Sequence, residues 1–327
     1  MSQGVPQADL VYFGKLPCRG DFIRSAQHAP LVDSLDRWQS QSMDRLAADP
    51  RWKLIYDAAP AVQFAILGNK SPVGLAGTWL ASQDASGRRF PFVLGAAFDL
   101  PDPQSFTAVS PLALGRLWAK LDQTTRQAFA SPDLEQVQSQ MTGQIEFDAS
   151  RPSSRAGLVD FLETHSVASL EQMLAAAGNR MSVRQAVLAL GLLLQPVMAQ
   201  GPARLTRALR FPLVQDRLLR APVAAFWLSL VHGFFLRHEV EWGVFMVTSD
   251  GKPSMVLSFQ GACASTMNAL MDPVQLQSQC VTLDEADWVE SEVDADYGLR
   301  KLSNYLKDPA MSLAQALRTY EEVFLGQ

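Results

Sequence analysis

The chain has 327 residues, a formal net charge of −5 and an apolar fraction of 48%. This length predicts about two domains. The composition excludes wholesale disorder, because it supplies enough apolar side chains for a core. A chain with net negative charge lacks the overall basic character of nucleic-acid-binding proteins, so no nucleic-acid partner is expected.

The cysteines and the apolar stretches indicate where the protein resides. Cys18, Cys263 and Cys280 are far apart and form no CxxC pair, so free thiols in a reducing compartment are expected. The most apolar stretches, 186–194 and 223–236, are shorter than the roughly 20 residues that span a bilayer. The N-terminus does not resemble a signal peptide. We therefore expect a cytoplasmic protein that does not span a membrane.

The first half of the chain mixes strand and helix patterns. Apolar runs bounded by turn residues predict strands over 10–13, 62–67, 75–81 and 90–98. Apolar residues at helical spacing predict a helix over 31–48, with Pro30 in its first turn. The pair Ser110-Pro111 predicts the start of a second helix, whose buried stripe is Leu114, Leu117, Trp118 and Leu121.

The second half is richer in helix patterns. A polar stretch over 142–155 predicts a boundary between two domains, 1–148 and 149–327. Helices are predicted over 156–164, 170–177, 183–198, 264–271 and 312–325. The range 222–236 fits a helix or, as the alternative, a strand.

A β-hairpin over 243–259 is the clearest local prediction, since two strand-like runs flank the turn Asp250-Gly251. The chain lacks a regular βαβ rhythm, which favours the α+β class. We expect an N-terminal antiparallel or mixed sheet with flanking helices, followed by a helix-rich C-terminal part that contains the hairpin.

Motifs of catalysis and metal binding are missing from the sequence. HExxH, GxGxxG, the phosphate-binding loop and the GxSxG elbow do not occur. His232 and His238, six residues apart, do not share a helix face. No catalytic residue, metal or cofactor is therefore expected.

Two segments combine charged side chains with glycine and proline. In 13–22, Asp21 either pairs with Arg19 or caps the next element, whereas Lys15 and Arg19 would face a carboxylate or phosphate if they bind a partner. In 87–92, Arg88 and Arg89 either clamp an anion or one of them pairs with Asp21. The tripeptide Arg89-Phe90-Pro91 occurs again as Arg210-Phe211-Pro212, but this repeat is too short to indicate a duplication.

The same two segments carry a family resemblance. FGKLPCRGDF at 13–22 and GTWLASQDASGRRFPFVLG at 77–95 resemble, in order and spacing, two signatures of the TagF family, also called ImpM, of type VI secretion-associated proteins. A looser resemblance covers 202–287, and the tail after Asp287 matches nothing. The signature residues, which are the candidate partner contacts, are Lys15, Pro17, Arg19, Gly20, Asp21, Phe22, Trp79, Arg88, Arg89, Phe90 and Pro91.

The resemblance implies regulation without catalysis. Members of the TagF family are cytoplasmic, post-translational repressors of type VI secretion system assembly. They are associated with the forkhead-associated (Fha) scaffold protein of that system, which is therefore the expected partner. The alternative is a phosphate-, phosphopeptide- or small-molecule-binding protein, or a weak enzyme, that uses the basic cluster Lys15, Arg19, Arg88 and Arg89.

Overall fold

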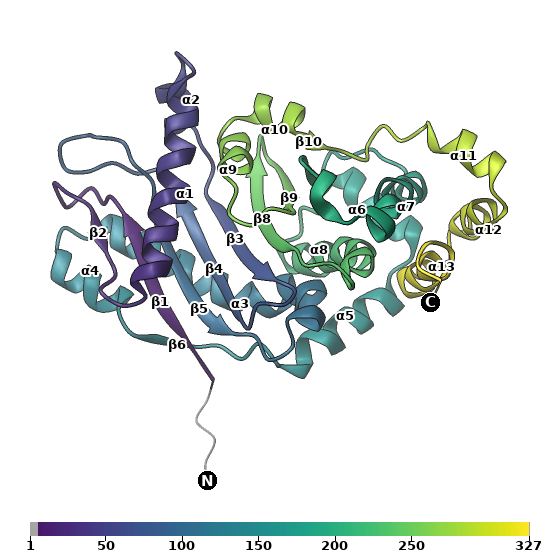
Figure 1. Ribbon diagram of the computed structural model, residues 1–327, viewed down its shortest axis with the longest axis horizontal. Coiled ribbons are helices and arrows are strands. Elements are labelled where there is room, and N and C mark those ends of the chain that lie inside the picture. The colour runs from purple at the N-terminus through teal and green to yellow at the C-terminus, as the bar shows by residue number, and fades with distance from the viewer. Residues whose placement is uncertain (1–5, 327) are drawn as a thin grey trace, which may run out of the picture.

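The computed structural model describes residues 6–326, which build one twisted sheet with helices on both faces (Figure 1). The strand order is β10-β7-β9-β8-β3-β4-β5-β1-β2, and β6 also pairs with β1. The described strands are β1 (Gln7–Gly14), β2 (Ile23–Arg24), β3 (Val62–Gly68), β4 (Val73–Leu80), β5 (Phe92–Asp99), β6 (Gln144–Glu146), β7 (Ala208–Pro212), β8 (Glu241–Ser249), β9 (Lys252–Ser258) and β10 (Cys280–Val281). β10 runs parallel to β7 and the other pairs are antiparallel, so the expected mixed sheet of an α+β fold is confirmed.

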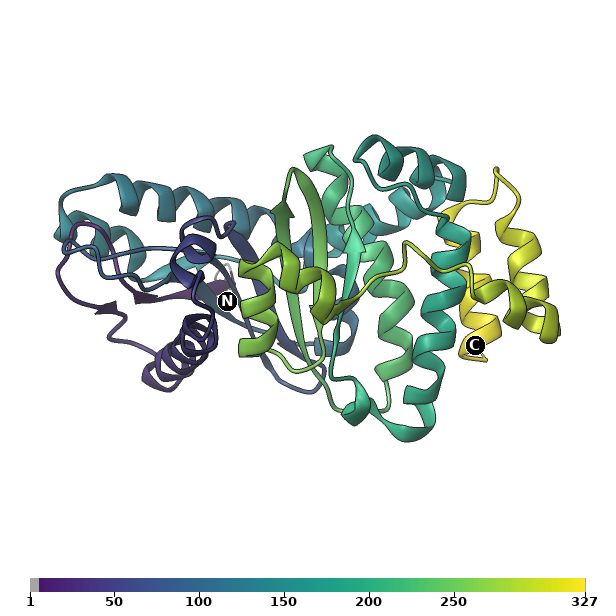
Figure 2. The same cartoon turned by 90° about the horizontal axis from the view of Figure 1, so that it is seen from above.

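The helices form a layer on each face of the sheet, which is clearest from above (Figure 2). One layer holds α1 (Ala29–Ala47), α2 (Trp52–Asp57), α9 (Ala264–Met271) and α10 (Pro273–Gln279). The other holds α3 (Pro103–Ala130), α4 (Leu134–Met141), α5 (Pro152–Thr164) and α8 (Arg217–His232). At one end of the molecule α7 (Val183–Gln200) packs on α8, and around α7 pack α6 (Val167–Ala176), α11 (Val289–Ala295), α12 (Tyr297–Leu306) and α13 (Leu313–Phe324).

Alternation of side chains along the strands separates two apolar clusters. In β1, Leu10 and Tyr12 join the cluster under α3, whereas Val11 and Phe13 join the cluster under α1. Each strand of the central sheet is therefore buried on both faces, which explains the nearly continuous apolar runs in the sequence.

The halves of the chain meet edge to edge in the sheet. Strand β3 pairs with β8 from Val62↔Val247 to Gly68↔Glu241. The ranges 1–148 and 149–327 thus both contribute strands to one sheet, and their division into two domains stays a prediction.

Helix α3 corrects the prediction that Ser110-Pro111 begins a helix. It begins after Asp102, whose side chain accepts a hydrogen bond from the backbone N–H of Ser105, and it continues through Pro111. Pro111 cannot donate to the Thr107 carbonyl, and the Ser110 hydroxyl donates to that carbonyl instead at 2.9 Å. The predicted stripe Leu114, Leu117, Trp118 and Leu121 is buried as expected.

In the second half of the chain, too, a proline that was predicted to begin a helix lies inside one. Helix α8 begins after Asp216 and contains Pro222 in its interior, so the range 222–236 is helical and the strand alternative is wrong. The hairpin is confirmed, with φ of 51° at Asp250 and 74° at Gly251, as a tight hairpin turn requires. Short elements such as β2, β7 and α10 carried no strong pattern and were missed.

Two helical ranges, Val183–Gln200 and Arg217–Phe235, are long and apolar enough to cross a membrane by length and composition. Both ranges are longer than the apolar stretches 186–194 and 223–236 from which no membrane-spanning helix was expected. Within the fold, 50% of the first range and 61% of the second are buried.

Candidate functional site

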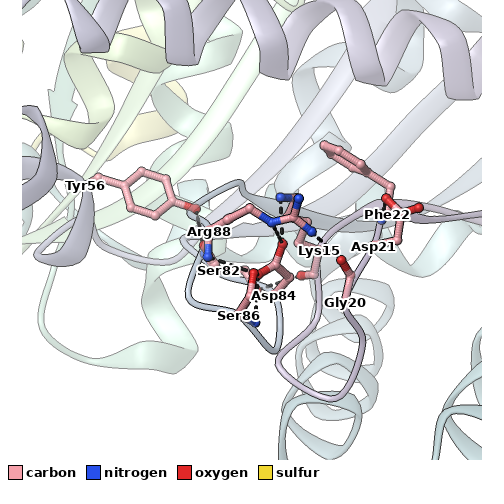
Figure 3. Close-up of polar contacts among 9 residues, drawn as sticks. All are labelled: Lys15, Gly20, Asp21, Phe22, Tyr56, Ser82, Asp84, Ser86 and Arg88. Carbon is pink, nitrogen blue, oxygen red and sulfur yellow. Dashed lines mark hydrogen bonds and ion pairs between the residues drawn. The ribbon is translucent and has the colours of Figure 1, made fainter.

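The two signature segments meet beside the end of β1, where Asp84 of the second segment binds Lys15 of the first (Figure 3). The Asp84 carboxylate accepts hydrogen bonds from Lys15 Nζ at 2.8 Å and from Arg88 Nε at 2.7 Å. It also accepts from the Ser86 hydroxyl at 2.7 Å and from the backbone N–H groups of Ser86 and Arg88. We call Lys15, Asp84, Ser86 and Arg88 the Asp84 cluster.

The cluster holds its carboxylate ionised. The side chain of Asp84 is 0% exposed, and that of Lys15 is 8% exposed. Burial by itself would raise the pKa of Asp84, but the hydrogen bonds from Lys15, Ser86 and Arg88 outweigh it and hold that pKa far below its usual value. The single carboxylate therefore pairs with two cations, the buried ammonium of Lys15 and the exposed guanidinium of Arg88.

Further hydrogen bonds fasten the first signature loop to the second. Arg88 Nη2 donates to the carbonyl of Gly20, and the backbone N–H of Ala85 donates to the carbonyl of Arg19 at 2.8 Å. The Ser82 hydroxyl donates to the carbonyl of Lys15 at 2.7 Å. The first two bonds hold the backbone carbonyls of Arg19 and Gly20, whereas the side chain of Arg19 is exposed.

A tyrosine from α2 supports the second loop from behind. The Tyr56 hydroxyl donates to the carbonyl of Ser82 at 2.8 Å and accepts from the Ser82 backbone N–H at 2.7 Å. Burial raises the pKa of Tyr56 well above its usual value, so this hydroxyl stays protonated and keeps both bonds.

Three phenylalanines close the same junction. The rings of Phe13 and Phe22 stack at 5.6 Å, and Phe90 meets Phe22 edge-on at 4.8 Å. Lys15 Nζ lies 4.8 Å from the centre of the Phe22 ring. Phe22 nevertheless remains 42% exposed, so one side of this packed ring faces solvent.

The predicted partners of Asp21 were wrong. Asp21 accepts a hydrogen bond from the Phe22 backbone N–H at 2.8 Å and pairs with no described arginine. Arg88 pairs with Asp84, and Arg89 binds both carboxylate oxygens of Asp57 at 2.7 Å. The acceptors are instead Asp84, in the turn four positions before Arg88, and Asp57 at the end of α2.

The signature thus divides into two sets. Lys15, Trp79 and Pro91 are buried, and Arg88 is exposed but engaged in the Asp84 cluster. The outward-facing set comprises Pro17, Arg19, Gly20, Asp21 and Phe22. Beside this exposed set lies a hollow of about 640 Å³, which Arg19, Phe22 and Arg24 share with α4.

Tyr56, Asp57 and Asp84 are not among the candidate site residues that the sequence indicated, although Asp84 lies within the second signature segment. Asp84 stands in the turn cluster 83–87, where an Asp commonly accepts bonds from the next backbone N–H groups. Asp84 also binds the buried Lys15, which lies 69 positions earlier, and so joins two distant parts of the chain. Among residues 6–326, no group of three histidine, cysteine or acidic side chains is arranged to hold a metal ion.

Comparisons with known proteins agree with the two signature segments. A family model for the TagF N-terminal domain, type VI secretion system-associated, matches residues 11–142. The crystal structure of PA0076 from Pseudomonas aeruginosa PAO1 is similar at 23% identity and a TM-score of 0.33, over 40% of this chain and 60% of that chain. This chain therefore spans less than two thirds of that protein. No curated protein matches.

Proposed function

Because residues 11–142 belong to the TagF N-terminal domain family, which is associated with type VI secretion systems, we propose that this protein regulates such a system by binding one of its components. In this proposal it is a cytoplasmic, non-enzymatic, post-translational repressor of assembly. Its partner is the forkhead-associated scaffold protein. The family match is the observation that carries the proposal.

The geometry of the signature supports protein binding over phosphate capture. Of the four cations in the alternative basic cluster, Lys15 and Arg88 share the carboxylate of Asp84, and Arg89 pairs with Asp57. These three cations already donate to carboxylates of the protein, so they are less available to bind an anion. Arg19 is the cation of that cluster without an ion pair among residues 6–326.

The outward-facing set is the part of the signature that a partner can reach. Arg19, Asp21 and the exposed side of Phe22 stand on a loop whose backbone is fastened by Arg88 and Ala85. A rigid loop loses little conformational entropy on binding, and an arginine beside an aromatic ring is a common energetic centre of interfaces. We assign partner binding to this loop and a fastening role to the Asp84 cluster.

The test measures binding of the purified chain to the purified scaffold protein. We expect Arg19→Ala/Asp21→Ala to weaken binding about ten-fold or more, because both side chains are exposed and hold no other element in place. The matched control is Arg318→Ala/Asp160→Ala, which removes two exposed residues of opposite charge on α13 and α5. In cells, the same loop variant should release effector secretion that the unaltered protein represses.

Equal scaffold binding by the loop variant and the control would exclude this loop as the contact. A folded chain that binds no secretion component at all would exclude the proposed function itself.

A further inference from the structure

A second basic site lies in the other half of the chain. Four segments form a cavity of about 390 Å³: the loop between α6 and α7, the end of β7, the start of β9 and the segment after β10. Figure 1 shows α6, β9 and β10 close together beside this end of the sheet. We propose that this cavity is a binding site for a phosphate monoester.

The lining carries an excess of positive charge. Arg180, Arg210 and Lys252 face the cavity against a single acidic residue, Asp284. Within residues 6–326, none of the three cations forms an ion pair. In the Asp84 cluster, by contrast, both cations form ion pairs with a carboxylate of the protein. A dianionic phosphate offsets the excess charge.

Neutral donors reinforce the preference for an oxyanion. Asn179 lines the cavity, and its buried side-chain Nδ2 has no hydrogen-bond partner in the described structure. A buried donor without an acceptor is costly, and a phosphate oxygen supplies the acceptor. The hydroxyl of Ser254 also lines the cavity and lies 3.4 Å from Arg210 Nε.

A comparison of the two Arg-Phe-Pro segments shows that the guanidinium of Arg210 is free of carboxylates. In the first segment, the guanidinium of Arg89 donates hydrogen bonds to both carboxylate oxygens of Asp57. In the second, the side chain of Arg210 has the long bond to Ser254 and no carboxylate partner. The planar fork of Arg210 therefore remains available for a bidentate bond to a phosphate.

The walls of the cavity indicate more than inorganic phosphate. Met181, Pro212, Pro253 and Leu283 supply apolar surface beside the cations. The cavity volume falls in the range of small-molecule sites, about 300–1,000 Å³. A phosphate attached to an organic group satisfies both parts of the lining. That group belongs either to a free small molecule or to a phosphorylated side chain of a protein.

Calorimetric titration of the full chain at low ionic strength tests the site. The probes are inorganic phosphate, adenosine monophosphate and a phosphothreonine peptide, with adenosine and the unphosphorylated peptide as matched references. We expect saturable binding of at least one phosphorylated organic probe and none of its unphosphorylated reference. Arg210→Gln and Lys252→Gln should each weaken that binding about ten-fold, the loss of one charge-assisted bond.

The control variant is Lys120→Gln, which removes an exposed lysine of α3 that does not line the cavity. It should bind as the unaltered chain does, and thermal melting should show all three variants folded. If Arg210→Gln fails to fold, Arg180→Gln at an exposed position replaces it. Tighter binding of adenosine monophosphate would indicate a free small molecule as the ligand. Tighter binding of the phosphothreonine peptide would indicate a phosphorylated side chain of a protein.

Absence of saturable binding by every phosphorylated probe would overturn the proposal. Binding that survives in both pocket variants, or that falls equally in Lys120→Gln, would overturn it too. Scaffold binding is measured separately and involves a different part of the surface, so either proposal can fail without the other.

Discussion

Lys15 and Asp84, which are 69 positions apart in the chain, form an ion pair of 2.8 Å with almost no solvent exposure. The pair joins the two signature segments and lies under the loop that carries Arg19 and Asp21. Within one motif, some residues thus bind one another, while their neighbours Arg19 and Asp21 face solvent.

Replacing Asp84 by asparagine should destabilise the protein markedly. Asp84→Asn leaves the buried ammonium of Lys15 without a counter-charge, so we expect the melting temperature to fall by about 5–10 °C. The double variant Lys15→Met/Asp84→Asn removes the unpaired charge and should recover part of the loss. Asp21→Asn is the control, since Asp21 is exposed and should melt within about 2 °C of the unaltered chain. Equal melting temperatures for Asp84→Asn and Asp21→Asn would contradict the assigned role.

The same carboxylate predicts a pH dependence. In the unfolded chain Asp84 takes up a proton near pH 4, whereas in the folded protein its lowered pKa keeps it ionised. Protonation therefore favours the unfolded state. The stability that Asp84 contributes is fully present above about pH 5 and is lost progressively below about pH 4. Urea unfolding at pH 7, 5, 4 and 3 should show the gap between the unaltered chain and Asp84→Asn narrowing below pH 4. A constant gap down to pH 3 would exclude this linkage.

The proline within α3 predicts a compensated pair. Ser110→Ala leaves the buried Thr107 carbonyl without a partner and should lower the free energy of unfolding by about 1 kcal/mol. In a Pro111→Ala background, the restored backbone N–H can donate to that carbonyl, so the same change should cost less. Chemical unfolding of the four chains measures the difference. An identical cost in both backgrounds would show that the Ser110 hydroxyl does not compensate for Pro111.

Two glycines of the first signature should respond differently to alanine. At Gly14, with φ of +138°, an added Cβ would lie 2.1 Å from the Pro91 carbonyl oxygen, so Gly14→Ala should cost about 3 kcal/mol or more. At Gly20 an added Cβ meets nothing within 4 Å, so Gly20→Ala should change stability by less than about 0.5 kcal/mol. Thermal melting compares them, and similar losses would refute the geometry. Loss of scaffold binding in folded Gly20→Ala would then report contact with the partner.

The local elements were largely determined by the sequence itself. Apolar runs predicted β3, β4 and β5, and the Asp250-Gly251 turn predicted the hairpin. These features depend on residues near one another in the chain, where side-chain period and backbone preference act directly. The signature segments likewise lie within residues 11–142, which the family model for the TagF N-terminal domain matches, because a motif is a property of the sequence.

Only the tertiary structure decided what the charged residues do. Ion pairing requires an acceptor within a few ångströms, and Asp84 and Asp57 reach Lys15 and Arg89 through sheet pairing and the packing of α2. Arg89 and Arg210 both precede Phe-Pro, yet Arg89 pairs with Asp57 and Arg210 has no carboxylate partner, for the same reason. Sequence determines which charges exist, and long-range packing determines which of them remain available to a partner.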